Sequence, residues 1–250
     1  MFDTHAHLCD EAFAADLAVV IERARAAGVE RILAVGENLS DARRNLEIAA
    51  SFPETVRPAA GLFPTVLDPA AAGELESWIR RHRDELYAVG EVGLDYWKVQ
   101  EEAEREVQAE IFSGFIELAR DIGLPLNVHS RSAGRATIAL LLEKGAQRVQ
   151  MHAFDGRASK AMPGVEAGFF FSVPPSVVRS AQKQKLVRHL PLSCLLLETD
   201  SPVLAAVAGE RNEPCRVLES LTAIAELKSL NVEEVRETVA ENSRRLYAGS

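Results

Sequence analysis

Short apolar runs alternate with amphipathic stretches along the whole chain. Several runs are apolar at every position, which is typical of parallel strands that are buried on both faces. The runs predict eight strands, at Met1–Asp3, Arg31–Val35, Val56–Ala60, Ala88–Glu91, Pro125–His129, Arg148–His152, Gly168–Ser172 and Cys194–Glu198.

Between these runs, apolar residues recur at steps of three and four, the spacing of one helix face. One such stripe is followed by Gly28, which is typical of a helix end, and a longer stripe runs from Val107 to Ile122 before Gly123. The first stripe consists of Phe13, Leu17, Ile21 and Ala24. Weaker patterns predict helices at Ser40–Ser51, Ala72–Glu85, Ala133–Glu143, Ser176–His189 and Val232–Leu246.

Eight strands that alternate with helices over 250 residues predict a (β/α)8 TIM barrel. We expect one domain that covers residues 1–250, because no linker or change of composition divides the chain. The alternative fold is a doubly wound open sheet. Such a sheet normally has a glycine-rich phosphate turn after its first strand, and the segment DTHAHL is not one.

Composition indicates a soluble protein of a reducing compartment, and we expect the cytoplasm. Hydrophobic residues make up 47% of the chain and charged residues 26%. The three cysteines form no CxxC motif, the start MFDTHAHL is too polar for a signal peptide, and no run approaches the about 20 apolar residues of a membrane helix. Nothing in the pattern calls for an obligatory protein partner.

The net charge of −9 disfavours a large basic surface for non-specific binding of nucleic acid. It does not exclude a nucleic-acid substrate, because bound cations can supply positive charge locally.

Polar side chains with metal-binding chemistry come at or just after the ends of the predicted strands. The carboxyl ends of all strands of a barrel meet at one mouth, so residues far apart in sequence come together there. These candidates are His5, His7, Glu91, His129, His152 and Asp200.

His5 and His7 are the sharpest local signal, because residues two apart in an extended chain point the same way. Imidazole suits Zn and Mn, and carboxylate suits the harder ions. We therefore expect a metal site in which Glu91 can bridge two ions, with Mg, Mn and Zn all open. His82 and His189 lie in helical patterns and are interpreted as ordinary surface residues.

Other polar residues near the predicted mouth are candidates for substrate contacts. Ser130 and Arg131 can hold a phosphate, since a guanidinium matches its oxygens in bidentate fashion. Asp95 is expected either to orient a histidine or to cap its loop. Trp78 and Trp97 are too isolated in the sequence to indicate a platform for base stacking.

Five motifs in order along the chain, DTHAHL, GEVGLDY, NVHSRSAGR, MHAFDG and ETDSP, resemble the TatD family of metal-dependent hydrolases, also described as TatD-type deoxyribonucleases. The resemblance spans nearly the whole chain. The segments HSRSAGR, HAFDGR, RNEP and SVPPSVVRSAQKQKLV look most like the subgroup typified by the animal TatD-domain-containing protein 3.

The resemblance implies a TIM barrel with two divalent ions that hydrolyses phosphodiester bonds in DNA, in several members from the 3′ end. By position, His5, His7 and Asp200 are implied to hold one ion. His129 and His152 are implied to hold the other, with Glu91 between the two. Asp200 is also implied to take a proton from the attacking water, so that Asp200 and Glu91 are the catalytic candidates.

One position departs from the family pattern. Members usually have Gly-x-His-Pro after the third strand, and this chain reads Gly61-Leu62-Phe63-Pro64. The usual histidine is thought to lie near the substrate phosphate, whereas phenylalanine neither donates a hydrogen bond nor carries charge. Loss of one such donor typically costs about 2.7–4 kcal/mol in the transition state.

Two other functions remain open from the residues. The first is an amidohydrolase-like enzyme that acts on a small ester, amide or phosphoester, although many such enzymes have a modified lysine where this chain has Glu91. The second is a metal-loaded barrel that binds nucleic acid or a partner without catalysis, because Phe63 has removed a catalytic donor.

Overall fold

Eight parallel strands form the inner wall of the molecule, whose computed structural model describes residues 1–247. Each strand pairs in parallel with the next in chain order, which confirms the predicted (β/α)8 barrel. A doubly wound sheet would reverse its order at a switch point, so that alternative is wrong. The strands are β1 (Phe2–Ala6), β2 (Arg31–Ala34), β3 (Val56–Ala60), β4 (Ala88–Gly93), β5 (Leu126–His129), β6 (Val149–Met151), β7 (Phe170–Val173) and β8 (Leu195–Leu197).

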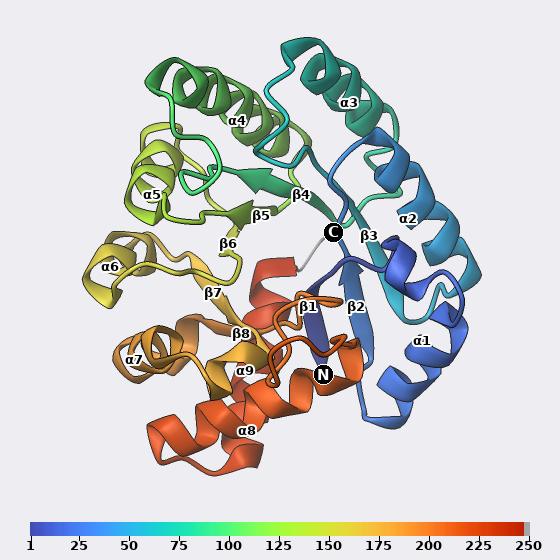
Figure 1. The fold of residues 1–250 in the computed structure, drawn as a ribbon, viewed down its shortest axis with the longest axis vertical. Coiled ribbons are helices and arrows are strands. Elements are labelled where there is room, and N and C mark those ends of the chain that lie inside the picture. The colour runs from blue at the N-terminus through green and yellow to red at the C-terminus, as the bar shows by residue number, and fades with distance from the viewer. Residues whose placement is uncertain (248–250) are drawn as a thin grey trace.

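The helices lie outside the strands and form a ring around them (Figure 1). They are α1 (Leu17–Ala26), α2 (Leu39–Ser51), α3 (Pro69–Arg81), α4 (Glu102–Ile122), α5 (Gly134–Glu143), α6 (Ala158–Glu166), α7 (Ala181–His189), α8 (Val217–Lys228) and α9 (Val232–Tyr247). Within residues 1–247, none of the helices has the length and apolar character needed to cross a membrane.

Local chemistry sets several helix ends. The Asn38 side chain accepts a hydrogen bond from the N–H of Asp41 at 3.1 Å and caps α2. Asp68 does the same for α3 ahead of Pro69, and Gly123 ends α4 in the left-handed region at φ 71°.

Three helical regions differ from the sequence-based expectation. The predicted helix Ser176–His189 is wrong in its first part, because a 3-10 turn at Pro175–Val178 comes before α7. Ser180 caps α7, which explains the later start. The sequence pattern does not predict α6, which contains Pro163. It also does not predict α8, whose apolar residues spread over a wide face of the helix and not along one narrow stripe.

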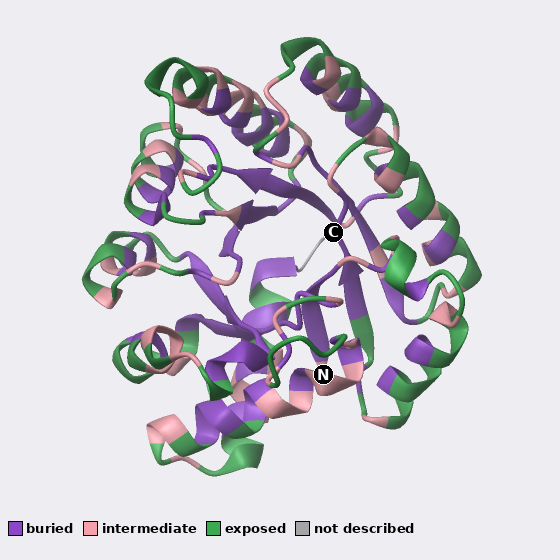
Figure 2. Cartoon of the chain, viewed as in Figure 1, coloured by how far each residue is buried: buried purple, intermediate pink, exposed green. Residues whose placement is uncertain are grey.

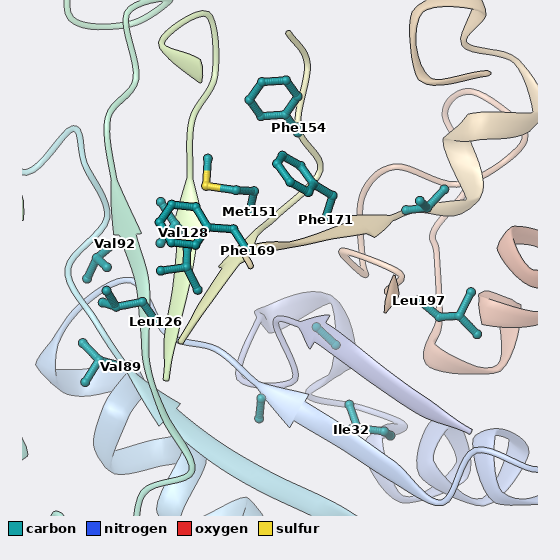
Figure 3. Close-up of a cluster of buried hydrophobic side chains, with 14 of the residues drawn as sticks. Ile32, Val89, Val92, Leu126, Val128, Met151, Phe154, Phe169, Phe171 and Leu197 are labelled. Carbon is teal, nitrogen blue, oxygen red and sulfur yellow. The ribbon is translucent and has the colours of Figure 1, made fainter. Parts of the chain in front are cut away.

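Alternate residues of each strand face opposite sides of the sheet and enter two separate cores. Outward residues such as Ile32, Leu126 and Leu197 pack with the helices in the larger buried cluster, part of which Figure 3 shows. Inward residues such as Leu33 and Leu196 form a smaller cluster inside the barrel. Figure 2 shows the result as a buried inner ring of strands and helices that are exposed on their outer faces.

The first and last strands meet through individual contacts near the mouth of the barrel. The Asp200 N–H donates to the His5 carbonyl at 2.9 Å, and the His7 N–H donates to the Ser201 carbonyl at 2.8 Å. An isolated parallel bridge joins Ala6 to Ser201. These contacts hold the segment after β8 against the end of β1, so that Asp200 lies beside both histidines.

Two strands extend further than the sequence predicts. β1 continues to Ala6, so that His5 lies within the strand, and β4 continues to Gly93, so that Glu91 lies within it. Both extensions are paired: Ala6 lies opposite Ala34, and Gly93 lies opposite His129. Pairing with a neighbouring strand keeps these segments extended although they include polar residues or glycine.

Candidate metal centre

Histidines and carboxylates from five strands lie together at the carboxyl end of the barrel. His5 and Glu91 are fully buried within β1 and β4, and Asp200 lies just after β8. Three groups of three side chains each place one ligand atom within 4.8 Å of the others: His5, His7 and Asp200; His5, Glu91 and His152; and His7, Glu37 and Glu91.

The group of His5, His7 and Asp200 has the spacing of ligands around one ion. The two Nε2 atoms lie 3.2 Å apart, and each lies 3.4 Å from Oδ1 of Asp200. Two ligand atoms at about 2.1 Å from one tetrahedral ion are separated by about 3.4 Å. The donor atoms therefore fit an ion without rearrangement of the backbone.

Glu91 divides its two oxygens between different imidazoles. Oε2 lies 3.7 Å from His5 Nε2 and 3.6 Å from His7 Nε2. Oε1 lies 2.6 Å from His129 Nδ1 and 3.8 Å from His152 Nε2. A carboxylate with one oxygen toward each set of histidines can contact two ions at once.

His129 differs from the other candidates because both of its ring nitrogens have a carboxylate partner. Nδ1 contacts Glu91, and Nε2 lies 3.0 Å from Oδ2 of Asp95. Among the described residues it belongs to none of the three-ligand groups. The other oxygen of Asp95 accepts the N–H groups of Trp97 and Lys98, so this side chain both orients the histidine and caps its loop.

The carboxylates of the cluster are held in the ionised form. Burial alone would raise the pKa of Glu91, but the charge and hydrogen bond of His129 lower it well below its usual value. Burial of Asp200 is likewise outweighed by the charge of His152 and by hydrogen bonds from two more imidazoles, so its pKa is also well below normal. Ionised carboxylates are the form that binds a cation.

The neighbouring carboxylates in turn raise the pKa values of three imidazoles. Burial would lower the pKa of His7, but the hydrogen bond with Asp200 raises it. Glu198 outweighs burial at His152 in the same way. The two carboxylate partners of His129 raise its pKa to about 10 against the effect of burial. An ion that takes these nitrogens must displace their protons.

Two residues behind the cluster orient its imidazoles and were not singled out from the sequence. Oδ1 of Asn127 lies 2.8 Å from His5 Nδ1, and Oε2 of Glu198 lies 2.8 Å from His152 Nδ1. Such partners direct the opposite ring nitrogen, Nε2, toward the centre. A polar residue two positions before His129 on the same strand face was the available signal for Asn127.

Glu37 is a third side chain that the sequence interpretation missed. It lies after β2, forms a group with His7 and Glu91, and is half-buried. Burial raises its pKa, with His7 acting in the opposite direction. Its position at a strand end was a signal of the same kind as that of the predicted ligands.

The predicted substrate residues lie around the cluster in different environments. The Ser130 hydroxyl is buried and has no hydrogen-bond partner within the part of the chain that the structure describes. Arg131 is exposed, with its guanidinium carbon 4.8 Å from the centre of the Trp97 ring. Phe63 packs edge-on against His129, with ring centres 5.2 Å apart.

Two glycines allow the strands to approach closely at this point. A Cβ at Gly61 would collide with the Glu91 carbonyl oxygen, and one at Gly93 would collide with the His129 carbonyl. Gly93 also has φ 149°, a conformation that other residues rarely adopt. These contacts explain why the motifs GLFP and GEVG have glycine at these positions.

Comparisons with known proteins give one consistent result. The family model described as TatD related DNase matches residues 2–248. The human protein named deoxyribonuclease TATDN3 is 41% identical over 261 residues, covering 99% of this chain and 94% of its own. YabD of Bacillus subtilis, named as an uncharacterized metal-dependent hydrolase, is 36% identical over 256 residues, covering 99% of this chain and 98% of its own. The crystal structure of YJJV, a TatD homologue from Escherichia coli, superposes with a TM-score of 0.91 at 26% identity and covers 100% of this chain and 98% of that chain.

Proposed function

The chain belongs to the family of TatD-related DNases, and from this premise we propose that it is a metal-dependent hydrolase that cleaves phosphodiester bonds in DNA. The observation that carries the proposal is the cluster at the barrel mouth. The imidazole nitrogens lie 2.6–3.8 Å from the oxygens of Glu91 and Asp200, and these residues come from strands at both ends of the chain. Metal-dependent relatives and these residue groups together support the use of divalent metal.

We propose that the site holds two ions. His5, His7 and Asp200 would hold the first ion, His129 and His152 would hold the second, and Glu91, which has one oxygen toward each set of histidines, would serve both. Divalent ions held there would supply polarisation of the phosphoryl oxygen and a lowered pKa of a bound water. His129 reaches this role only by losing its proton and one of its two carboxylate contacts. The mixed donor set suits Mg, Mn or Zn.

Individual side chains of the protein have separate roles in proton transfer and substrate binding. Asp200 is anionic and lies at the centre of the cluster, where it takes the proton of the attacking water. Arg131 binds a phosphate oxygen, and the Ser130 hydroxyl, which has no hydrogen-bond partner in the described part of the chain, donates to the substrate. Phe63 supplies only packing against His129, so one donor of the usual family pattern is absent from this reaction.

We also propose that the chain acts as one domain in the cytoplasm. All eight strands contribute to a single sheet, and the residues of the centre come from both its halves. The cysteines Cys9, Cys194 and Cys215 are all unpaired, which suits a reducing compartment.

The test is nuclease activity of the purified, metal-stripped protein on short end-labelled DNA, with Mg, Mn or Zn added back. A Glu91→Ala preparation serves as the control for contaminating nucleases. We expect metal-dependent shortening from one end that is absent in the variant. No cleavage with any ion, in protein shown to bind metal, would refute the nuclease and favour a hydrolase of a small ester or amide.

A further inference from the structure

Trp97 is an exposed aromatic side chain beside the candidate metal centre. It is 47% exposed, whereas Trp78 is 5% exposed and stacks on His82 in α3. Over residues 1–247 it is the only aromatic residue among the exposed large hydrophobic side chains. Its backbone N–H donates to Asp95, which contacts His129, so the exposed ring is in a position to contact a ligand of the site.

Trp97 and Arg131 form a pair although 34 positions separate them in the sequence. The guanidinium of Arg131 lies over the indole at 4.8 Å from the ring centre, a distance at which a cation is attracted to the face of the ring. The Arg131 carbonyl accepts the N–H of Tyr96 at 3.0 Å, which joins the two loops next to this pair.

The loop that carries Trp97 is held directly to the metal centre. The N–H of Trp97 donates to Asp95 at 3.0 Å, and the second oxygen of Asp95 contacts His129. Arg105 packs over the ring of Tyr96 at 4.3 Å and donates to the carbonyl of Val99. The indole is therefore a pre-positioned surface at the rim, not the tip of a free loop.

We propose that Trp97 and Arg131 form a nucleotide subsite at the rim, in which an unpaired base stacks on the indole and the adjacent phosphate binds the guanidinium. This subsite rests on the proposed function, because it supplies the substrate strand to the metal centre. Aromatic side chains stack on any base, and an arginine beside an aromatic ring can still donate its N–H groups to a phosphate. The buried Ser130 hydroxyl, next to Arg131 in sequence, has no hydrogen-bond partner among residues 1–247.

The overall charge explains why such a subsite is needed. At a net charge of −9 the protein has no excess of basic residues with which to hold a polyanion by electrostatics alone. Stacking supplies affinity that does not depend on charge. It also requires a base that is not paired, so the subsite selects single-stranded DNA or a frayed 3′ or 5′ end over an intact duplex.

Tryptophan fluorescence tests the stacking directly, because the protein has two tryptophans in contrasting environments. A short thymidine oligonucleotide is added to Glu91→Gln protein in Mg²⁺ buffer, where turnover is blocked. We expect quenching that persists in Trp78→Phe and disappears in Trp97→Phe. An abasic oligonucleotide of the same length should not quench. Quenching that survives in Trp97→Phe, or no base-dependent quenching in any variant, would overturn the subsite.

The affinity of Trp97 variants for the oligonucleotides provides a second test of the subsite. Trp97→Ala should weaken binding of the thymidine oligonucleotide by about 5- to 150-fold, the effect of losing one stacked base, while binding of the abasic strand changes little. Trp97→Phe should retain most of the affinity because it keeps a ring. Equal losses on both strands would mean that Trp97 has only a structural role.

The outcomes separate this subsite from the nuclease itself. Cleavage of DNA by the wild-type protein without any base-dependent quenching would leave the function intact and refute the subsite. Base-dependent quenching without cleavage would support the subsite and refute the nuclease.

Discussion

Two layers of buried polar side chains lie inside the barrel, a charged layer at the mouth and a neutral layer beneath it. Asn127 in β5 and Gln150 in β6 lie two positions before His129 and His152, so they point inward one layer lower. The amides of the neutral layer make hydrogen bonds of 2.6–3.2 Å. The Tyr247 hydroxyl donates to Gln150 at 2.6 Å, and Gln150 donates to the Ser172 hydroxyl at 2.9 Å.

Most contacts to Asp200 and Glu91 in the charged layer are longer than these hydrogen bonds. Its imidazole and carboxylate atoms approach Asp200 and Glu91 at 3.4–3.8 Å, except for the close pair with His129. Buried charges are costly to keep, and replacing them by apolar residues often stabilises a protein. The comparison supports the proposal that the charged layer binds cations, whereas the neutral layer serves the fold.

Phe63→His should add a donor to the mouth and raise kcat on DNA by as much as about 10²-fold, the effect of one well-placed donor in a transition state. Phe63→Leu is the matched control, since it keeps an apolar side chain against His129 and should leave kcat within a few-fold. Steady-state kinetics with saturating metal measure both. Equal rates in the two variants would show that position 63 does not reach the substrate.

Glu198→Gln should lower metal affinity by about 10- to 100-fold, because the carboxylate that orients His152 loses its charge. Titration against a chelator of known affinity measures the change. Glu226→Gln, on the exposed face of α8, is the control and should bind metal normally. Normal affinity in Glu198→Gln would mean that its hydrogen bond, rather than its charge, positions the imidazole.

Metal affinity should rise with pH. The pKa values of His7 and His152 are raised, and that of His129 is about 10, so the metal-free protein holds protons at neutral pH that an ion must displace. Affinity should therefore increase between pH 6 and pH 8, by about tenfold per pH unit for each proton released. Calorimetry in two buffers of different ionisation heat counts these protons. An affinity that is constant with pH would show that the imidazoles are already neutral.

Tyr247→Phe should affect stability and leave metal binding unchanged. It removes the hydroxyl that donates to Gln150 and leaves a buried amide oxygen without that partner, at a cost of about 1–3 kcal/mol in the free energy of unfolding. Denaturant unfolding and metal titration of the same sample measure the two properties. A parallel loss of metal affinity would show that the two layers are coupled.

Sequence patterns were sufficient for most of the fold, because a strand that is buried on both faces needs a continuous apolar run. The patterns located all eight strands but ended the first too early, since pairing with β2 extends β1 as far as Ala6. They failed for α6 because Pro163 interrupts the pattern of that helix. Residues 248–250 of the expected domain lie outside the described part of the chain.

The amino-acid sequence by itself determined which side chains come at the ends of the strands, and the parallel order of the strands made their meeting predictable. The contacts among them were decided by the tertiary structure. The enclosure of His129 between two carboxylates, the orientation of His5 by Asn127, and the pairing of Arg131 with Trp97 each join residues at least 34 positions apart. The directions of such side chains follow from how distant strands and loops pack, and no local pattern in the sequence records them.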